Sequence, residues 1–242
     1  VGANSLESLP PEIGNLTNLT HLDVGINSLK SLPTWIGNLT NLTELNFVEN
    51  IARTLPPEIQ LLTRLTSLNI YNNDLQSLPP EIGNLTNLNW LHISRNSLKR
   101  LPAEIRNLTN LTWLDLSDNR FESAPPEIWS LTNLERLDLS VNSLESLPPE
   151  IGNLTNLTHL NVNSNKLSDV PEEISRLINL TVLSISGNKL RLIPLGVTKL
   201  ANLLELYVSR NSLISLPPEI GDMVNLTCLV ANQNQLTGLL QE

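Results

Sequence analysis

One residue type recurs at a fixed spacing along the whole chain, and this constrains the fold more than any other feature. Asparagine stands at every 23rd position with no insertion or deletion. The eleven positions are Asn4, Asn27, Asn50, Asn73, Asn96, Asn119, Asn142, Asn165, Asn188, Asn211 and Asn234. All 16 prolines also fall into two adjacent columns of this repeat. A period of this length predicts stacked supersecondary units, and we expect a single domain over residues 1–242 made of about ten 23-residue repeats.

Each repeat changes its apolar spacing part way through, as the unit that begins at Leu134 shows. Residues 137–139 read Leu-Asp-Leu, and this alternation is typical of a short strand. In contrast, Ile151, Leu154 and Leu157 lie three positions apart, which is the spacing of a helical turn. The Pro-Pro-Glu sequence before Ile151 suits the first turn of a helix, because proline there lacks only a hydrogen that would have no partner. We therefore expect one strand and one short helix in every repeat.

The repeat pattern LxxLxLxxNxLxxLPxEIxxL resembles the leucine-rich repeat, and the resemblance covers essentially the whole chain. It implies an α/β solenoid of the leucine-rich-repeat horseshoe type, with a concave parallel β-sheet and short convex helices or 3-10 turns. The 23-residue form with LPxEIGNLTNL is similar to the repeats of Scribble and Erbin, plant intracellular Ras-group-related proteins, bacterial Roco proteins and spirochaete repeat proteins. In such a solenoid, a buried asparagine in each turn can pair its amide with backbone groups of adjacent turns.

The side chains at alternate strand positions should face solvent on the concave sheet, because leucine and isoleucine at the positions between them face the core. Trp90 and Trp113 occupy equivalent positions one repeat apart, which places their side chains about 5 Å apart on neighbouring strands. Tryptophan, tyrosine and arginine are enriched where binding energy is concentrated. The predicted partner-binding residues are Trp90, Trp113, Tyr71, His92, Arg95, Asp115 and Arg136. Cross-strand stacking that only stabilises the sheet is the other interpretation of the tryptophan pair.

The sequence contains no constellation typical of an enzyme. Asp115 and Asp138 could serve acid–base chemistry or cation binding, but the basic side chains nearby provide simpler charge compensation. His21 near Asp23 resembles a base with its orienting acid, yet no serine or cysteine nucleophile is placed to complete a triad. The histidines lie too far apart to share a metal, and no phosphate-binding GxxxxGK[ST] motif occurs. We therefore expect no enzyme activity, no catalytic residue, no cofactor and no metal.

Charge and hydropathy exclude two classes of partner. The net charge of −9, from 15 basic and 24 acidic residues, argues against binding to nucleic-acid phosphates. Every apolar run is far shorter than the roughly 18 to 20 residues that cross a bilayer. The first residues also lack a basic stretch followed by an apolar one. We therefore expect no nucleic acid as a partner, no membrane span and no retained signal peptide.

Two expectations concern the compartment and the ends of the array. Cys228 is the single cysteine, so an intramolecular disulfide is excluded. The cysteine-paired caps common in secreted animal repeat domains are missing, which favours a cytosolic or bacterial origin over eukaryotic secretion. The chain begins inside a repeat at Val1 and ends after Leu239 and Leu240 without a proline and helix segment. We expect either a piece of a longer protein or an array without full caps, with self-association through uncapped ends as the competing interpretation.

These observations predict a non-enzymatic protein–protein interaction module that binds a protein or peptide on its concave sheet. Two alternatives stay open at this point. Trp90 and Trp113 could instead recognise a carbohydrate or a cell surface. The regular repeats could also form a consensus-like scaffold without a natural ligand, although the residues at the concave positions differ from repeat to repeat.

Overall fold

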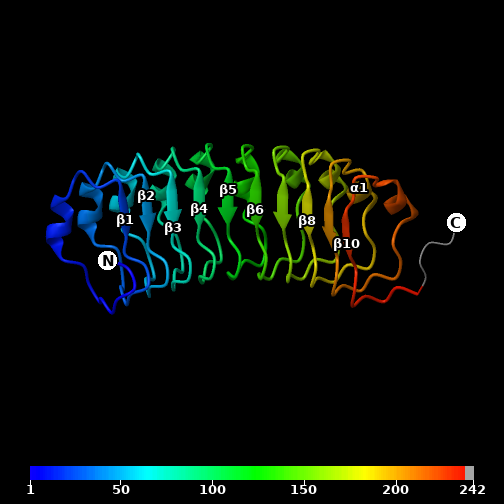
Figure 1. Cartoon of the computed structure of the whole chain (residues 1–242), viewed down its shortest axis with the longest axis horizontal. Coiled ribbons are helices and arrows are strands. Elements are labelled where there is room, and N and C mark those ends of the chain that lie inside the picture. Colours follow the sequence, from blue (N-terminus) through cyan, green and yellow to red (C-terminus); the bar gives the residue numbers. More distant parts are fainter. Residues whose placement is uncertain (238–242) are drawn as a thin grey trace. The chain divides into compact units, whose positions relative to one another are not determined.

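A computed structural model describes residues 1–237, and contacts divide the chain into two compact units, Val1–Arg120 (unit 1) and Phe121–Glu242 (unit 2). In each unit short strands alternate with short helical turns, and the strands lie on one side with the turns on the other (Figure 1). Leu239 and Leu240, on which the prediction about the end of the array depends, lie outside the described residues. The division does not test the prediction of a single domain over residues 1–242, which stays a prediction.

Unit 1 contains five strands that pair in parallel in chain order. Every strand pairs with the next at an offset of one repeat, as Leu68 does with Leu91, so equivalent positions of successive repeats stand side by side. The strands are β1 (His21–Asp23), β2 (Glu44–Asn46), β3 (Ser67–Asn69), β4 (Trp90–His92) and β5 (Trp113–Asp115). The 3-10 helices are η1 (Pro11–Asn15), η2 (Thr34–Asn38), η3 (Pro57–Leu61), η4 (Pro80–Asn84) and η5 (Ala103–Asn107).

Unit 2 repeats this plan over its described residues 121–237. Its parallel strands are β6 (Arg136–Asp138), β7 (His159–Asn161), β8 (Val182–Ser184), β9 (Glu205–Tyr207) and β10 (Cys228–Val230). Its 3-10 helices are η6 (Pro126–Ser130), η7 (Pro149–Asn153), η8 (Glu172–Arg176) and η9 (Pro218–Asp222), and its one described α-helix is α1 (Leu195–Thr198). In the described part of the chain, no helix combines the length and the apolar character that a bilayer crossing needs.

The proline columns begin the helical turns, as the sequence predicts. In η4, Pro79 is the N-cap with an extended backbone, and Pro80 and Glu81 lie in the first turn. Pro80 loses no helical hydrogen bond at this position, and the Glu81 carboxylate faces the positive end of the turn. The repeat with Leu195-Gly196-Val197, which lacks this glutamate, forms α1 in place of a 3-10 helix. A parallel sheet with short helices or 3-10 turns opposite it is thus confirmed in each unit.

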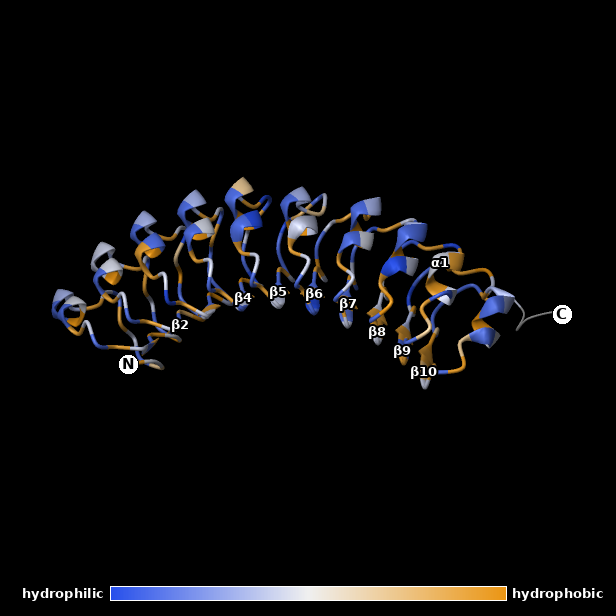
Figure 2. Cartoon of the chain, turned by 90° about the horizontal axis from the view of Figure 1, so that it is seen from above, coloured by the Kyte–Doolittle hydropathy of each residue, from blue (hydrophilic) through white to orange (hydrophobic). Residues whose placement is uncertain are grey.

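The core of each unit lies between the strands and the turns and consists mainly of leucine and isoleucine. In unit 1 the middle residue of every strand is buried while both of its neighbours keep some exposure, as the pleat of a strand requires. The isoleucines of the turns, such as Ile82 and Ile105, are fully buried against the same core. Figure 2 shows the apolar residues of the turns on their inner side, with polar residues outside. The apolar columns of the sequence therefore correspond to one continuous core within each unit.

The recurring asparagine joins each repeat to the one before it, as predicted. Asn96 is 9% exposed, and its side-chain oxygen accepts a hydrogen bond from the backbone N–H of Leu75 at 2.9 Å. Its side-chain nitrogen donates to the carbonyl of Ile70 at 3.0 Å and to two carbonyls of its own turn. Asn50, Asn119 and Asn165 make equivalent bonds. The amide thus satisfies buried backbone groups that the short strands leave without partners.

The residue before each asparagine has a left-handed backbone, which the sequence does not reveal. Arg95 has φ of 57° and Asp118 has φ of 49°, and the same conformation occurs at Val141. In this column only Gly187 is a glycine, the residue type that tolerates such a conformation best. The repeat holds these residues in place, because the backbone N–H of Arg95 donates to the Ser117 carbonyl in the next repeat.

We predict that Asn96→Ala lowers the free energy of unfolding by about 2 kcal/mol, because buried backbone groups of Leu75 and Ile70 lose their partners. Urea denaturation followed by circular dichroism measures the change. The control is Asn110→Ala, which removes one exposed hydrogen bond from the side chain of Asn110 to the carbonyl of Thr86 and should cost less than about 1 kcal/mol. Equal losses in the two variants would show that the buried column has no special role.

Candidate partner-binding surface

The outward side chains of β1–β5 form one surface of unit 1, which we call the strand face. Trp90 of β4 and Trp113 of β5 are partners in the strand register, so their side chains project next to each other. Their rings pack edge to face, with centroids 5.6 Å apart and planes at 72°. Trp113 is 38% exposed, whereas Trp90 is half-buried. The structure therefore places the two tryptophans together on the strand face, as the sequence predicts.

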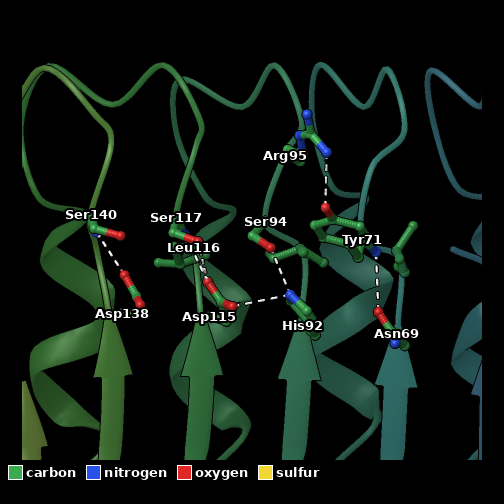
Figure 3. A network of polar contacts seen from close by, with 12 residues as sticks. Asn69, Tyr71, His92, Ser94, Arg95, Asp115, Leu116, Ser117, Asp138 and Ser140 are labelled. Carbon is green, nitrogen blue, oxygen red and sulfur yellow. Dashed lines mark hydrogen bonds and ion pairs between the residues drawn. The ribbon is translucent and has the colours of Figure 1, made fainter. Parts of the chain in front are cut away.

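His92 connects the tryptophans to polar neighbours on both sides. Its ring lies 5.5 Å from the Trp90 ring and 5.2 Å from the Tyr71 ring, measured between centroids. Its Nε2 atom lies 3.0 Å from an Asp115 carboxylate oxygen and 2.6 Å from the Ser94 hydroxyl. Figure 3 shows His92 in contact with Asp115 of the neighbouring strand and with Ser94, two residues further along its own repeat. This arrangement fixes the imidazole and, through it, the edge of the aromatic cluster.

Arg95 and Tyr71 extend the cluster at the end of the strands. The Arg95 guanidinium donates to the Tyr71 hydroxyl at 3.0 Å and lies 5.9 Å from the centroid of the tyrosine ring (Figure 3). Its Nε atom lies 3.5 Å from a carboxylate oxygen of Asp118 in the next repeat. The hydrogen bond to Tyr71 raises the pKa of Arg95, whose guanidinium is charged at neutral pH in any case. A cation is thus held in a defined position beside the aromatic rings.

Asp115 is a charged acceptor at the centre of this network. Burial acts to raise the pKa of Asp115, but hydrogen bonds from His92 and from the side chain and backbone of Ser117 outweigh it and leave the pKa lowered. The Ser117 hydroxyl donates to the carboxylate at 2.7 Å and the Ser117 backbone N–H donates to it at 2.9 Å. Asp115 is therefore ionised at neutral pH and orients His92, which itself contacts two aromatic rings.

A hollow of about 270 Å³ opens on the strand face beside Trp90. Trp90 lines it together with Ser67 and Asn69 of the preceding strand. Two carboxylates, those of Asp23 and Glu44, also line it. The hollow has room for a side chain of a bound partner, and its acidic residues favour a cationic one.

Six of the seven residues predicted from the sequence lie together on unit 1, whereas Arg136 lies on β6 of unit 2. There Arg136 pairs in register with His159. Burial, and then the positive charge of Arg136, lower the pKa of His159. The role of all seven residues in partner binding stays a prediction.

Sequence analysis missed three residues that hold the cluster in place. Ser94 and Ser117 bond to His92 and Asp115, and Asp118 forms the ion pair with Arg95. A signal was present for Asp118, because opposite charges one repeat apart become neighbours on adjacent turns. The serines gave no such signal, since serine occurs in this column in several repeats.

The structure brings His21 to Glu44 rather than to Asp23. The Nε2 atom of His21 lies 3.2 Å from a carboxylate oxygen of Glu44 in the next repeat, and its Nδ1 atom contacts the hydroxyl of Thr20. One Asp23 oxygen instead accepts a hydrogen bond from the backbone N–H of Gly25. Residues two apart on a strand share a face, but the closer neighbour of His21 is the residue at the same position of the adjacent strand.

We predict that Asp115→Asn lowers the free energy of unfolding by about 1 kcal/mol at neutral pH, because the charged hydrogen bonds are lost. Since the pKa of Asp115 is lowered in the fold, its contribution is complete above the ordinary value of 3.8 and disappears as the pH falls through the lowered pKa. The difference between the variant and the original chain should therefore shrink below about pH 4. Urea denaturation at several pH values measures it.

The control for this experiment is Asp118→Asn, which removes the exposed ion pair with Arg95 and should change the free energy of unfolding by less than about 0.5 kcal/mol at neutral pH. Asparagine is a mild replacement at position 115, because Asn69 occupies the equivalent position of β3 and also accepts from the backbone two residues on. A pH-independent loss for Asp115→Asn would contradict the assignment of the charged hydrogen bonds.

Comparison with known proteins gives a consistent set of matches. The family described as "Leucine-rich repeat region" matches residues 80–168 and 103–185, and the family described as "Leucine Rich Repeat" matches residues 64–85 and 179–200. Together these matches extend over residues 64–200, which is more than half of the chain. A comparison with curated proteins finds no match.

Several solved structures share the fold. The leucine-rich repeat protein LIC12759 of Leptospira interrogans is 38% identical with a TM-score of 0.90, and the match covers 98% of this chain and 66% of that one. The ectodomain of the Arabidopsis thaliana receptor kinase GASSHO1/SCHENGEN3, in complex with CASPARIAN STRIP INTEGRITY FACTOR 2, is 33% identical with a TM-score of 0.70 over 93% of this chain and 31% of that one. The plant peptide hormone receptor RGFR1, in complex with RGF2, is 28% identical with a TM-score of 0.71 over 98% of this chain and 49% of that one.

The chain thus spans about two thirds of the Leptospira protein and half or less of the two plant receptors. The repeat pattern, the parallel strands with their opposing 3-10 turns, the asparagine column and these matches agree with one another. The chain belongs to the leucine-rich repeat proteins.

Proposed function

We propose that the strand face of unit 1 binds a protein or peptide, with Trp90 and Trp113 at the centre of the contact. The observation that carries this proposal is the partly exposed aromatic cluster, joined to Arg95 and Asp115 through His92 and Tyr71, beside a hollow of about 270 Å³. Tryptophan, tyrosine and arginine are the residues in which binding energy is most often concentrated.

The polar contacts of the cluster are formed without a partner. His92, Asp115 and Ser117 fix one another by hydrogen bonds, and Arg95 is held between Tyr71 and Asp118. Side chains that are already ordered lose little conformational entropy on binding. The hydrogen bonds that stabilise the fold at this surface should therefore also increase the affinity for a partner.

The indole nitrogen of Trp90 argues against a purely stabilising role for the tryptophan pair. This nitrogen is buried without a hydrogen-bond partner, a situation that costs about 1 to 3 kcal/mol. A residue without a side-chain hydrogen-bond donor, such as the valine at the equivalent position of β8, would avoid this cost. The buried nitrogen therefore supports a role of Trp90 in contact with a partner.

The relatives support a protein or peptide as the partner. The GASSHO1/SCHENGEN3 ectodomain was solved in complex with CASPARIAN STRIP INTEGRITY FACTOR 2, and the plant peptide hormone receptor RGFR1 in complex with RGF2. Leucine-rich repeat proteins are typically non-enzymatic interaction modules, and we propose that role for this chain. A cytosolic or bacterial location is part of the same proposal and rests on the sequence alone.

The geometry favours a protein or peptide over a carbohydrate. Sugar recognition by a pair of tryptophans would be served best by two open ring faces, whereas these rings pack edge to face. Trp90 is half-buried, so Trp113 supplies most of the exposed ring. The acidic residues at the hollow instead suit a cationic side chain of a peptide.

Selection of displayed random peptides against the immobilised chain tests this proposal. We expect the selected peptides to carry a basic residue and to bind Trp90→Ala/Trp113→Ala at least about 30-fold more weakly, which corresponds to about 2 kcal/mol. Isothermal titration measures the affinities, and circular dichroism verifies that the variant is folded. Unchanged affinity in the folded double variant would refute the assignment of the site.

The matched control is Trp35→Glu, which removes a tryptophan from η2 on the side opposite the strands. Glutamate occupies the equivalent position of η1, η3 and η4, so the repeat accommodates it. This variant should bind the selected peptides as tightly as the original chain. A glycan array serves as the second arm, and specific glycan binding without selected peptides would favour the carbohydrate alternative.

A further inference from the structure

A second surface of unit 1, away from the strands, carries a concentration of positive charge. It is a groove of about 860 Å³ formed by the segments between the asparagine column and the helical turns. Four cationic side chains line it, and they are Arg53, Lys99, Arg100 and Arg120. Asp74 is the one acidic residue among those that line this groove in unit 1. We name this surface the basic groove.

The backbone beneath the basic groove is fixed by hydrogen bonds between successive repeats. The N–H of Asp74 donates to the carbonyl of Ala52 at 3.0 Å, and the N–H of Gln76 donates to the carbonyl of Arg53 at 3.1 Å. The N–H of Arg120 donates to the carbonyl of Leu98 at 2.8 Å. The cationic side chains therefore project from a preformed platform, so a ligand meets them at a defined spacing.

The four cationic side chains of the basic groove have no ion-pair partner among the described residues. Across residues 1–237, the side chains of Arg53, Lys99, Arg100 and Arg120 form neither an ion pair nor a hydrogen bond. This contrasts with Arg95 of the strand face, which is held by Tyr71 and Asp118. The contrast matters because the chain as a whole is acidic, with 24 acidic residues against 15 basic ones. Four of the 15 basic residues thus gather in one groove and keep their hydrogen-bond donors free.

We propose that the basic groove is a second binding site, which takes a carboxylate-rich peptide segment of a partner protein. Arginine guanidinium groups match carboxylates in charge and geometry and bind them through paired hydrogen bonds. Ser77 and Ser97 also line the groove and add neutral hydroxyl donors. A volume of about 860 Å³ exceeds what a single anion fills and suits several side chains of an extended peptide.

A nucleic acid fits the groove less well than an acidic peptide. Long phosphate polymers would extend beyond the groove and meet the acidic remainder of the chain, whose net charge is −9. A short carboxylate-rich segment needs only the local positive charge. This site goes beyond the function proposed for the strand face, because none of its residues lies on a strand.

The test uses the full chain and fluorescein-labelled hexaglutamate, with hexaglutamine as the uncharged counterpart, in fluorescence anisotropy at low ionic strength. We expect hexaglutamate to bind and hexaglutamine not to bind, and we expect the affinity to fall as salt is added. Arg100→Ser/Arg120→Ser should weaken hexaglutamate binding about fivefold, the effect of losing two exposed charge contacts. Serine is present at the equivalent positions of neighbouring repeats, in Ser77 and Ser97, so the variant should fold.

The matched control removes the same amount of charge outside the groove. Arg64→Asn/Arg106→Gln replaces two other arginines by residues of equivalent positions, Asn41 and Gln60. This control should change the affinity for hexaglutamate by less than about twofold, since these arginines lie outside the groove and the interaction between charges in water weakens with distance. Conversely, Asp74→Ser should tighten binding about twofold, an effect that partial unfolding cannot produce.

The proposal is overturned if hexaglutamate fails to bind, if hexaglutamine binds equally well, or if the two double variants weaken binding to the same extent. Tighter binding of inorganic polyphosphate than of hexaglutamate through the same arginines would also overturn it and assign the groove to phosphate polymers. Trp90→Ala/Trp113→Ala should bind hexaglutamate as the original chain does. This separates a failure of the basic groove from a failure of the strand face.

Discussion

The buried asparagine amide is the contact on which the rest of the structure depends. A strand of three residues leaves most backbone groups of its repeat outside the ladder, and these groups are buried once the repeats stack. Asn96 serves Leu75 and Ile70 of the previous repeat, so one side chain closes its own turn and attaches it to its neighbour. Because the column recurs without a gap, equivalent residues within each unit come to stand one repeat apart on adjacent strands or turns.

Because the repeat is regular, residues that are 23 positions apart in the sequence lie side by side in the fold. Trp90 meets Trp113, His92 meets Asp115, and Arg95 meets Asp118, each one repeat further along. The position of an outward-facing residue in the repeat therefore determines which residue of the next repeat lies beside it, whatever the two residue types are. Pairs of this kind order the strand face, and the leucine core beneath it is unaffected by their identity.

The same regularity separates charge by column within unit 1. Carboxylates such as Glu81 and Glu104 stand in the first turn of the 3-10 helices, where they face the positive end of the turn. The cations of the basic groove stand on the connecting segments between strand and helix. A chain with a net charge of −9 thus has a locally positive surface. The net charge alone therefore does not indicate which partners each face attracts.

The sequence was sufficient to predict the repeat period, the positions of strands and turns, the core, and the pairing of Trp90 with Trp113. An uninterrupted repeat determines which residues become neighbours. Only the tertiary structure showed that Ser94 and Ser117 hold His92 and Asp115, and that Arg95 has a left-handed backbone. It also brought Arg53, Lys99, Arg100 and Arg120 around one groove. The direction of a side chain and the depth of a groove depend on how successive turns pack, and the sequence of the repeats does not specify that packing.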